Sequence, residues 1–377
     1  MSGVTALLVL AGSACAVERG ESAFSGADGA ATDSGAATGE TTGGEDPGGG
    51  SAADGGDDGA DPDEGDEGAI FDLPSGDADA GLPSDGCSKV DFLFIIDNSI
   101  SMGDEQDNLA ASFPSFISTI EQEVVSDYHV MVIDTDGEDK WDEELVECYS
   151  GDCDGEPADE PCGILPPENG WACGALPVPD ACDAMLGAGV DHDGSDARVS
   201  CGLPDGQRWF SDTQPDVAST FGCMANLYDG NSPELTMGGM LSALSPAMNS
   251  AGGCNDGFLR DDAVLVVTFI SDEEDDGDSI GSPQTWRDEL LALKGGNDTA
   301  VVMLGLLGDT GLPSAVCPPD SVAGSNGGEY SPRLIEVVDG FAPRGVWGSV
   351  CAADYGPFFA EAVALIDTAC TEFEPEG

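Results

Sequence analysis

The sequence predicts an α/β fold with a doubly wound, mostly parallel sheet flanked by helices and a disulfide-rich insertion. Runs such as VDFLFII (residues 90–96) and AVLVVTFI (263–270) are almost wholly apolar, as strands are when both faces of a parallel sheet are covered. Segments with helical spacing of apolar residues lie between such runs. Strands that alternate with helices along a chain indicate parallel pairing with right-handed crossovers.

The first half of the domain is expected to begin with the strand at 90–96. A helix follows at 103–125, where apolar residues recur at helical spacing and Pro114 is expected to kink it. YHVMVID, at 128–134, is expected to form a second strand.

Regular pattern is absent from 135 to 232, where seven cysteines lie among Pro, Gly and Asp. Because disulfides can replace a hydrophobic core, we expect a stapled insertion at about 148–232. The alternation then resumes, and the expected elements are a helix start in LTMGGMLSALSPAM (235–248), a strand at 263–270, a helix at 282–294, a strand at 299–307, a short helix at 331–341, an outer strand at 345–350 and a closing helix at 355–370.

The first 86 residues are expected to lie outside this domain, which we place at 87–376. Residues 1–15 are predicted to be a lipoprotein-type signal peptide, because the apolar stretch VTALLVLAGSA has the length of a signal-peptide core and is followed by Cys15. The small residues before Cys15 resemble a bacterial lipobox, in which the cysteine is lipidated. An ordinary cleaved signal with a leftover cysteine is the alternative.

Residues 16–86 are rich in Gly, Ala, Ser, Asp and Glu, and are predicted to form a disordered acidic tether. Residue 16 is Ala and not Asp, which by resemblance to the sorting of Gram-negative lipoproteins favours the outer membrane. The expected location is therefore an exported outer-membrane lipoprotein that faces the periplasm or the cell surface.

The chain has 13 cysteines, many for a protein kept in a reducing compartment. Without Cys15 the count is even, which indicates up to six disulfides. Two pairings are hypotheses: Cys87 with Cys370, which would clamp the ends of the domain, and Cys317 with Cys351, which flank the last strand.

The charge is strongly negative, with 74 acidic against 10 basic residues and a formal net charge of −64. Phosphate binding needs a basic surface, so no nucleic-acid partner is expected. The charge favours solubility, divalent cations or basic partners, and a solvated acidic surface is an equally weighted explanation.

Polar residues follow the first strand in the segment DNSIS. Alternate residues of an extended loop point the same way, so Asp97, Ser99 and Ser101 are expected to converge above the sheet edge. Hard oxygen ligands suit Mg²⁺, Mn²⁺ or Ca²⁺. The alternative is a helix cap, with Ser101 and Asp104 forming a capping box and Asp97 capping a turn.

Two later segments are expected at the same edge. Asp272 follows the strand at 263–270, although Ser271 with Glu274 would also suit a helix cap. Thr236 lies at a loop-to-helix junction before two glycines.

DNSIS, TMGGMLSAL and ISDEED together resemble the three segments of the metal-ion-dependent adhesion site (MIDAS) of von Willebrand factor type A (vWA) domains. The resemblance implies a vWA/Rossmann-like fold. It implies that Ser99 and Ser101 bind a divalent cation directly, that Asp97 and Asp272 bind it directly or through water, and that Thr236 completes the site. Glu234 is an alternative to Thr236.

By this resemblance the expected function is a non-catalytic, divalent-cation-dependent binding or adhesion module. Its partner would be an unknown protein or glycan that offers an acidic group to an open coordination position on the metal. The protein would associate with the membrane only through its lipid anchor. One alternative is an acidic, cation-binding structural envelope protein. A less favoured alternative is a hydrolase that uses Asp272 with Glu273 or Glu274.

Two other acidic segments, 134–144 and 191–196, resemble calcium loops but have neither the EF-hand glycine nor its final glutamate. The chain has only two histidines, His129 and His192, and no GxSxG segment. A catalytic triad is therefore not expected, and His129 is interpreted as structural.

Overall fold

The computed structural model describes residues 88–136, 180–195, 198–204, 206–227, 230, 233–275, 277–318 and 327–374. The predictions for the signal peptide, Cys15, the tether and Cys87 fall outside these residues. So do four cysteines of the insertion and most of the segment 134–144.

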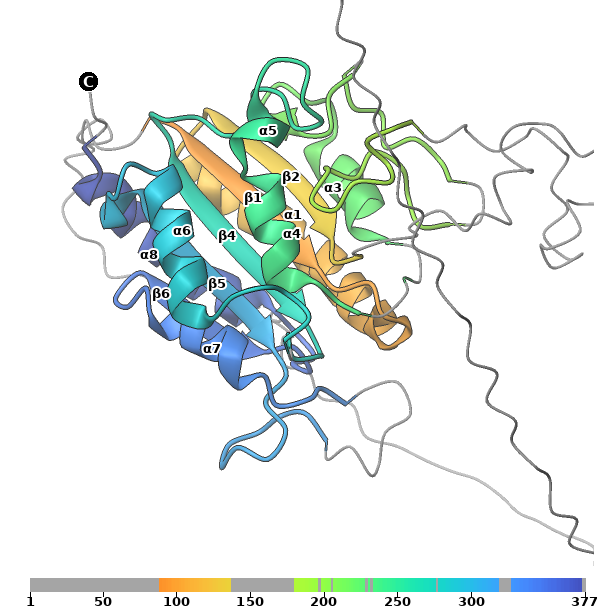
Figure 1. The fold of residues 1–377 in the computed structure, drawn as a ribbon, viewed down its shortest axis with the longest axis vertical. Helices are drawn as coiled ribbons and strands as arrows, with labels where there is room; N and C mark the ends of the chain where they lie inside the picture. The colour runs from red at the N-terminus through yellow and green to blue at the C-terminus, as the bar shows by residue number, and fades with distance from the viewer. Residues whose placement is uncertain are drawn as a thin grey trace, which may run out of the picture. The chain divides into compact units, whose positions relative to one another are not determined.

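A six-stranded sheet forms the centre of the fold (Figure 1). Its strands lie in the order β3-β2-β1-β4-β5-β6, and all pairs are parallel except β3 with β2. The strands are β1 Val90–Ile96, β2 Tyr128–Asp134, β3 Phe210–Ser211, β4 Val264–Ser271, β5 Val301–Leu307 and β6 Gly345–Ser349. The predicted mostly parallel sheet is thus confirmed.

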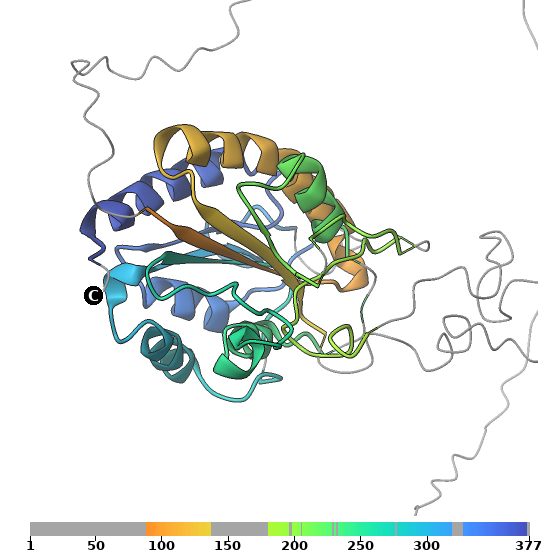
Figure 2. The same cartoon turned by 90° about the horizontal axis from the view of Figure 1, so that it is seen from above.

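Helices cover both faces of this sheet (Figure 2). One face carries α1 Gly103–Glu123, α3 Val217–Ala225 and α8 Gly356–Glu372; the other carries α4 Thr236–Ala243, α5 Pro246–Asn249, α6 Pro283–Leu293 and α7 Pro332–Asp339. Pro114 lies inside α1. Among the described residues, no helix is both long and apolar enough to cross a membrane.

Alternate side chains of each central strand enter two separate cores. On β1, Phe92 and Phe94 pack with α1, α3 and α8, whereas Leu93 and Ile95 pack with α4, α6 and α7. Burying one such side chain contributes about 1.5–3 kcal/mol. The apolar runs therefore reflect a sheet that is covered on both sides.

The insertion contributes to one of these cores, which the sequence did not predict. Phe221 of α3 is fully buried, stacks on Phe113 with ring centroids 3.5 Å apart, and meets Phe94 edge-on at 4.9 Å. The expectation that regular elements are absent from 135–232 is thus wrong for α3 and β3. The physical reason is that α3 is short and is stabilised by long-range aromatic packing.

Three disulfides join described cysteines. Cys201–Cys223 joins two parts of the insertion, one of them α3, and Cys182–Cys254 links the insertion to the loop that follows α5. Cys317–Cys351 is the pairing predicted around the last strand. Cys370 is also disulfide-bonded; Cys87 lies outside the described residues, so the pairing between these two stays a prediction.

A buried ion pair lies at the amino end of the central strands. Asp91, with 0% exposure, accepts hydrogen bonds from Nε of Arg260 at 2.7 Å and from its backbone N–H at 2.7 Å. Burial raises the pKa of Asp91 to about 6, although Arg260 opposes the shift. Nearby, Nδ1 of His129 lies 2.9 Å from the carbonyl oxygen of Phe258, and its ring packs on Trp209, so His129 has structural contacts, as interpreted from the sequence.

The direction of strand addition reverses between β1 and β4. From β1 the chain moves outward to β2 and β3, then returns to β4 and continues to β5 and β6 on the other side. The loops after β1 and β4 lead to helices on opposite faces of the sheet (Figure 2). In open α/β sheets, ligands bind at the carboxyl ends of the strands beside such a reversal.

Candidate cation-binding site

Asp97 lies at this reversal and is fully buried. Its Oδ1 accepts a hydrogen bond from the backbone N–H of Ser99 at 2.8 Å, and its Oδ2 accepts one from the hydroxyl of Ser271 at 2.6 Å. Ser271 was not predicted to contact the site. The parallel register pairs Ile96 with Ile270, so the next residues of both strands meet at the sheet edge.

The two serines of the DNSIS segment face each other. The hydroxyl oxygens of Ser99 and Ser101 are 3.0 Å apart, and the Ser101 hydroxyl is close enough to the carboxylate of Asp272 to lower its pKa, against the larger effect of burial. The structure therefore joins Asp97, Ser99, Ser101 and Asp272 in one contiguous set. Oδ1 of Asp272 is buried and has no hydrogen-bond partner among the described residues.

The helix-cap alternatives are wrong for Ser101 and Ser271, whereas Asp97 does cap a turn, since its Oδ1 accepts a hydrogen bond from the backbone N–H of Ser99, two residues later. The N-cap of α1 is Met102, which makes no side-chain cap, and the Ser101 hydroxyl lies 3.0 Å from that of Ser99. The Ser271 hydroxyl is likewise engaged with Asp97, and the next helix, α6, is capped by Ser282.

Burial and mutual repulsion set the electrostatics of the site. Burial, and then the charge of Asp97, raise the pKa of Asp272 to about 7. The same two causes raise the pKa of Glu234 to about 8. Burial also raises the pKa of Asp97 itself. Excess buried negative charge of this kind is relieved by protons or by a bound cation.

Thr236 is the first residue of α4 and is 1% exposed. The helix start is fixed by Asp275, whose Oδ2 accepts from the backbone N–H of Met237 at 3.0 Å. Glu234, two residues earlier, accepts a hydrogen bond from Thr135 and is close enough to Asp97 for their charges to interact. The segment thus reaches the site, and Glu234 has the clearer electrostatic link to Asp97.

Of the acids after Asp272, Glu274 turns away toward α7. Its Oε2 accepts from the backbone N–H of Arg333 at 2.7 Å. Glu273 interacts electrostatically with the site. Burial is the largest cause of its raised pKa, and the negative charge of Asp97 is the second.

The donor set suits a hard divalent cation. Its members offer carboxylate and hydroxyl oxygens, and the orphaned Oδ1 of Asp272 is a buried acceptor that lacks a donor or cation. No group of three or more His, Cys, Asp or Glu that would hold a metal occurs in the described part of the chain. The predicted set does not form such a group, since it combines two carboxylates with three hydroxyls.

Comparisons with known proteins identify no family. No protein-family model matches this chain, and no curated protein matches it. The resemblance to vWA domains therefore stays a prediction that rests on the three segments and on their arrangement.

The insertion reaches the loop that carries the site. The backbone N–H of Gly230 donates to the carbonyl oxygen of Asn98 at 2.7 Å, and the Asn98 side chain donates to Asp136 at 3.0 Å. A cavity of about 60 Å³ lies between Asn98, Asp136 and the segment 188–194. The insertion thus borders the site on its β2 side.

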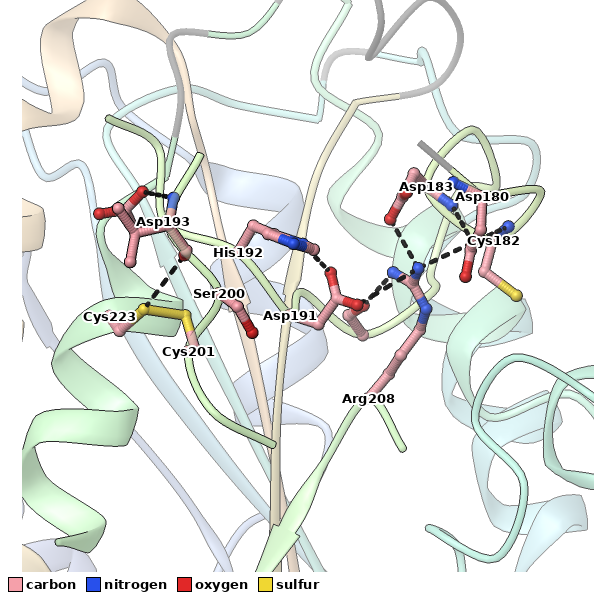
Figure 3. Close-up of polar contacts among 12 residues, drawn as sticks. Asp180, Cys182, Asp183, Asp191, His192, Asp193, Ser200, Cys201, Arg208 and Cys223 are labelled. Atoms are coloured by element: carbon pink, nitrogen blue, oxygen red, sulfur yellow. Dashed lines mark hydrogen bonds and ion pairs between the residues drawn. A yellow bond between two sulfur atoms is a disulfide. The ribbon is translucent and has the colours of Figure 1, made fainter. Parts of the chain in front are cut away.

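A charged cluster centred on Arg208 fixes this part of the insertion (Figure 3). Arg208 is buried, and its Nη2 lies 2.6 Å from Asp183 and 2.8 Å from Asp180. Asp191 lies 3.6 Å from the same nitrogen and 2.6 Å from Nδ1 of His192. The guanidinium is thus fully compensated, and the cluster has the character of a structural anchor.

The calcium-like segment 191–196 is described as far as Ser195. Oδ1 of Asp193 accepts from the Ser195 hydroxyl at 2.7 Å and from the Val199 N–H at 2.8 Å. These contacts form a hydrogen-bonded turn in which Oδ1 of Asp193 is already occupied by two donors.

Proposed function

We propose that residues 87–376 form a vWA-like, divalent-cation-dependent binding module that catalyses no reaction. The observation that carries this proposal is the contiguous set Asp97, Ser99, Ser101 and Asp272 at the reversal of strand order, with a buried carboxylate oxygen left without a partner. A bound Mg²⁺, Mn²⁺ or Ca²⁺ would supply positive charge and an open coordination position there.

Each residue of the set has a distinct part. The serine hydroxyls contact the cation, and the carboxylates of Asp97 and Asp272 balance its charge. Ser271 and the N–H of Ser99 hold the Asp97 carboxylate in one orientation. The partner then completes the coordination with a carboxylate of a protein or glycan.

Isothermal titration calorimetry of the purified chain with MgCl₂, MnCl₂ and CaCl₂ tests the proposal. The wild type is expected to show one site of micromolar or tighter affinity that Asp97→Ala abolishes. Asp367→Ala, an exposed site on α8, is the control for loss of one negative charge and is expected to bind as the wild type does. Only weak, numerous sites that Asp97→Ala leaves unchanged would support the structural, cation-buffering alternative instead.

The proposal includes attachment to the outer membrane through Cys15. Cells grown with labelled palmitate are expected to label the wild type and not Cys15→Ser. Equal label in both, or in neither, would remove the lipoprotein part of the proposal and leave the binding site unaffected.

A further inference from the structure

Glu105 is a buried acid that the proposed ligand set does not use. It lies in the first turn of α1, immediately after the site loop, and is only 3% exposed. Its Oε2 has no hydrogen-bond partner within the described residues. Buried carboxylates of folded proteins are normally hydrogen-bonded, so such an oxygen needs a physical explanation.

The surroundings of Glu105 increase the cost of its charge. Burial raises the pKa of Glu105 to about 8, followed by a side-chain hydrogen bond with Asp104 and then by the charges of Asp104 and Asp272. The charges of Glu105 and Asp272 both raise the pKa of the buried Tyr355 hydroxyl. This hydroxyl donates its hydrogen bond to the carbonyl oxygen of Val350, at 2.6 Å, and not to Glu105. The folded chain thus places the Glu105 carboxylate within electrostatic reach of Asp272 without giving its Oε2 a donor.

Asp272 shows the same property, since its Oδ1 is also buried without a partner. Because the charge of Asp272 also raises the pKa of Glu105, a cation close to both carboxylates would stabilise the ionised form of each. Glu105 does not join Asp97 and Asp272 in a three-acid group able to hold a metal. If Glu105 contacts the cation only through a cation-bound water, its Oε2 gains a hydrogen-bond donor without Glu105 being a direct ligand.

We propose that Glu105 is an outer-sphere carboxylate of the cation site, which accepts a hydrogen bond from a water bound to the cation and strengthens cation binding. This inference rests on the proposed function. It adds to that function a positioning residue outside the three segments, and it explains why the chain retains a buried acid that destabilises the cation-free fold.

Glu105→Gln tests the inference, because it removes the charge and keeps the shape. Glu123→Gln is the matched control: it lies on the same helix, is exposed, and is 18 residues or roughly 27 Å away along the axis. Both variants and the wild type are titrated with MgCl₂ and CaCl₂ by calorimetry. Their melting temperatures are measured in EDTA and in saturating cation, above pH 8, where Glu105 is largely ionised.

The expected result has two parts. Glu105→Gln raises the Kd for the cation about 10- to 100-fold, as loss of an outer-shell carboxylate typically does. The same variant melts at a higher temperature than the wild type in EDTA, because the buried repulsion is gone, yet gains less from added cation. Glu123→Gln changes neither quantity.

Three outcomes overturn the inference. A wild-type Kd in Glu105→Gln shows that Glu105 plays no part in binding, while the proposed function stands. A lower melting temperature of Glu105→Gln in EDTA shows that the residue is structural. Absence of cation binding by the wild type removes the proposed function and this inference together.

Discussion

Replacement of Arg260 by Met is expected to destabilise the fold most at high pH. Its Nε hydrogen bond to Asp91, at 2.7 Å, would be lost and would leave a carboxylate with 0% exposure without its counter-charge. Breaking a buried pair by removing one partner costs about 3–5 kcal/mol. Burial already disfavours the ionised form of Asp91 in the wild type: its pKa of about 6, against 3.8 for an unperturbed aspartate, corresponds to about 3 kcal/mol at neutral pH.

The pH dependence follows from the direction of this pKa shift. Because the folded-state pKa lies above the unfolded value, the stability contributed by Asp91 is fully present below pH 3.8 and is lost as the pH rises through about 6. Without the guanidinium the pKa rises further. The deficit of Arg260→Met in the free energy of unfolding should therefore be about 3–5 kcal/mol near pH 8, but only about 2 kcal/mol near pH 5, where the guanidinium hydrogen bonds to Val90 and Asp127 are still lost.

Urea unfolding of the oxidised chain at both pH values measures these deficits. The double variant Asp91→Asn, Arg260→Met is the control, and it should recover most of the loss near pH 8, since position 91 can no longer ionise and the buried Lys294 keeps its hydrogen bond to the backbone carbonyl oxygen of residue 260. Equal deficits of Arg260→Met at the two pH values would refute the reasoning, because they would show that lost packing and not an ionised Asp91 is responsible.

Three further predictions concern stability. His129, whose pKa burial lowers to about 4, should stay neutral in the folded chain and reduce stability as the pH falls from 6.5 toward 4; a ring NMR titration midpoint near 6.5 would contradict this. Phe221→Ala should lower the free energy of unfolding by about 3–5 kcal/mol in urea, and a loss near zero would mean that α3 does not belong to the core. Cys317→Ser with Cys351→Ser should lower it by about 3–4 kcal/mol, because the bond closes a loop with a sequence separation of 34; an unchanged urea midpoint would contradict that contribution.

The sheet was predictable from the sequence because its central strands are buried on both faces. Such strands are continuous apolar runs, so 90–96 and 128–134 were predicted with the limits that the structure shows. The insertion was not predictable in the same way. Helix α3 has nine residues, too few to be stable alone, and its register depends on Phe113 and Phe94, which lie far away in the sequence.

The site was partly predictable for a related reason. Topology alone brings the residues after β1 and β4 to one edge, so Asp97 and Asp272 were expected there. The role of Ser271 depends on the register between those strands, and Glu105 requires knowledge of burial in three dimensions. Local sequence rules also predicted helix caps at Ser101 and Ser271, but the Ser101 hydroxyl pairs with that of Ser99 in the same loop, and the Ser271 hydroxyl donates to Asp97 on the neighbouring strand.

The hydrogen bond between Ser271 and Asp97 joins residues that are 174 positions apart. The two residues meet only when β4 has paired with β1 in the register that places Ile96 beside Ile270. A fragment made during synthesis or export, before β4 emerges, therefore contains Ser99 and Ser101 but lacks Ser271 and Asp272. If the site binds a cation as proposed, capture of that cation would report that β4 has paired with β1, and a chain without this pairing would remain unable to engage its partner.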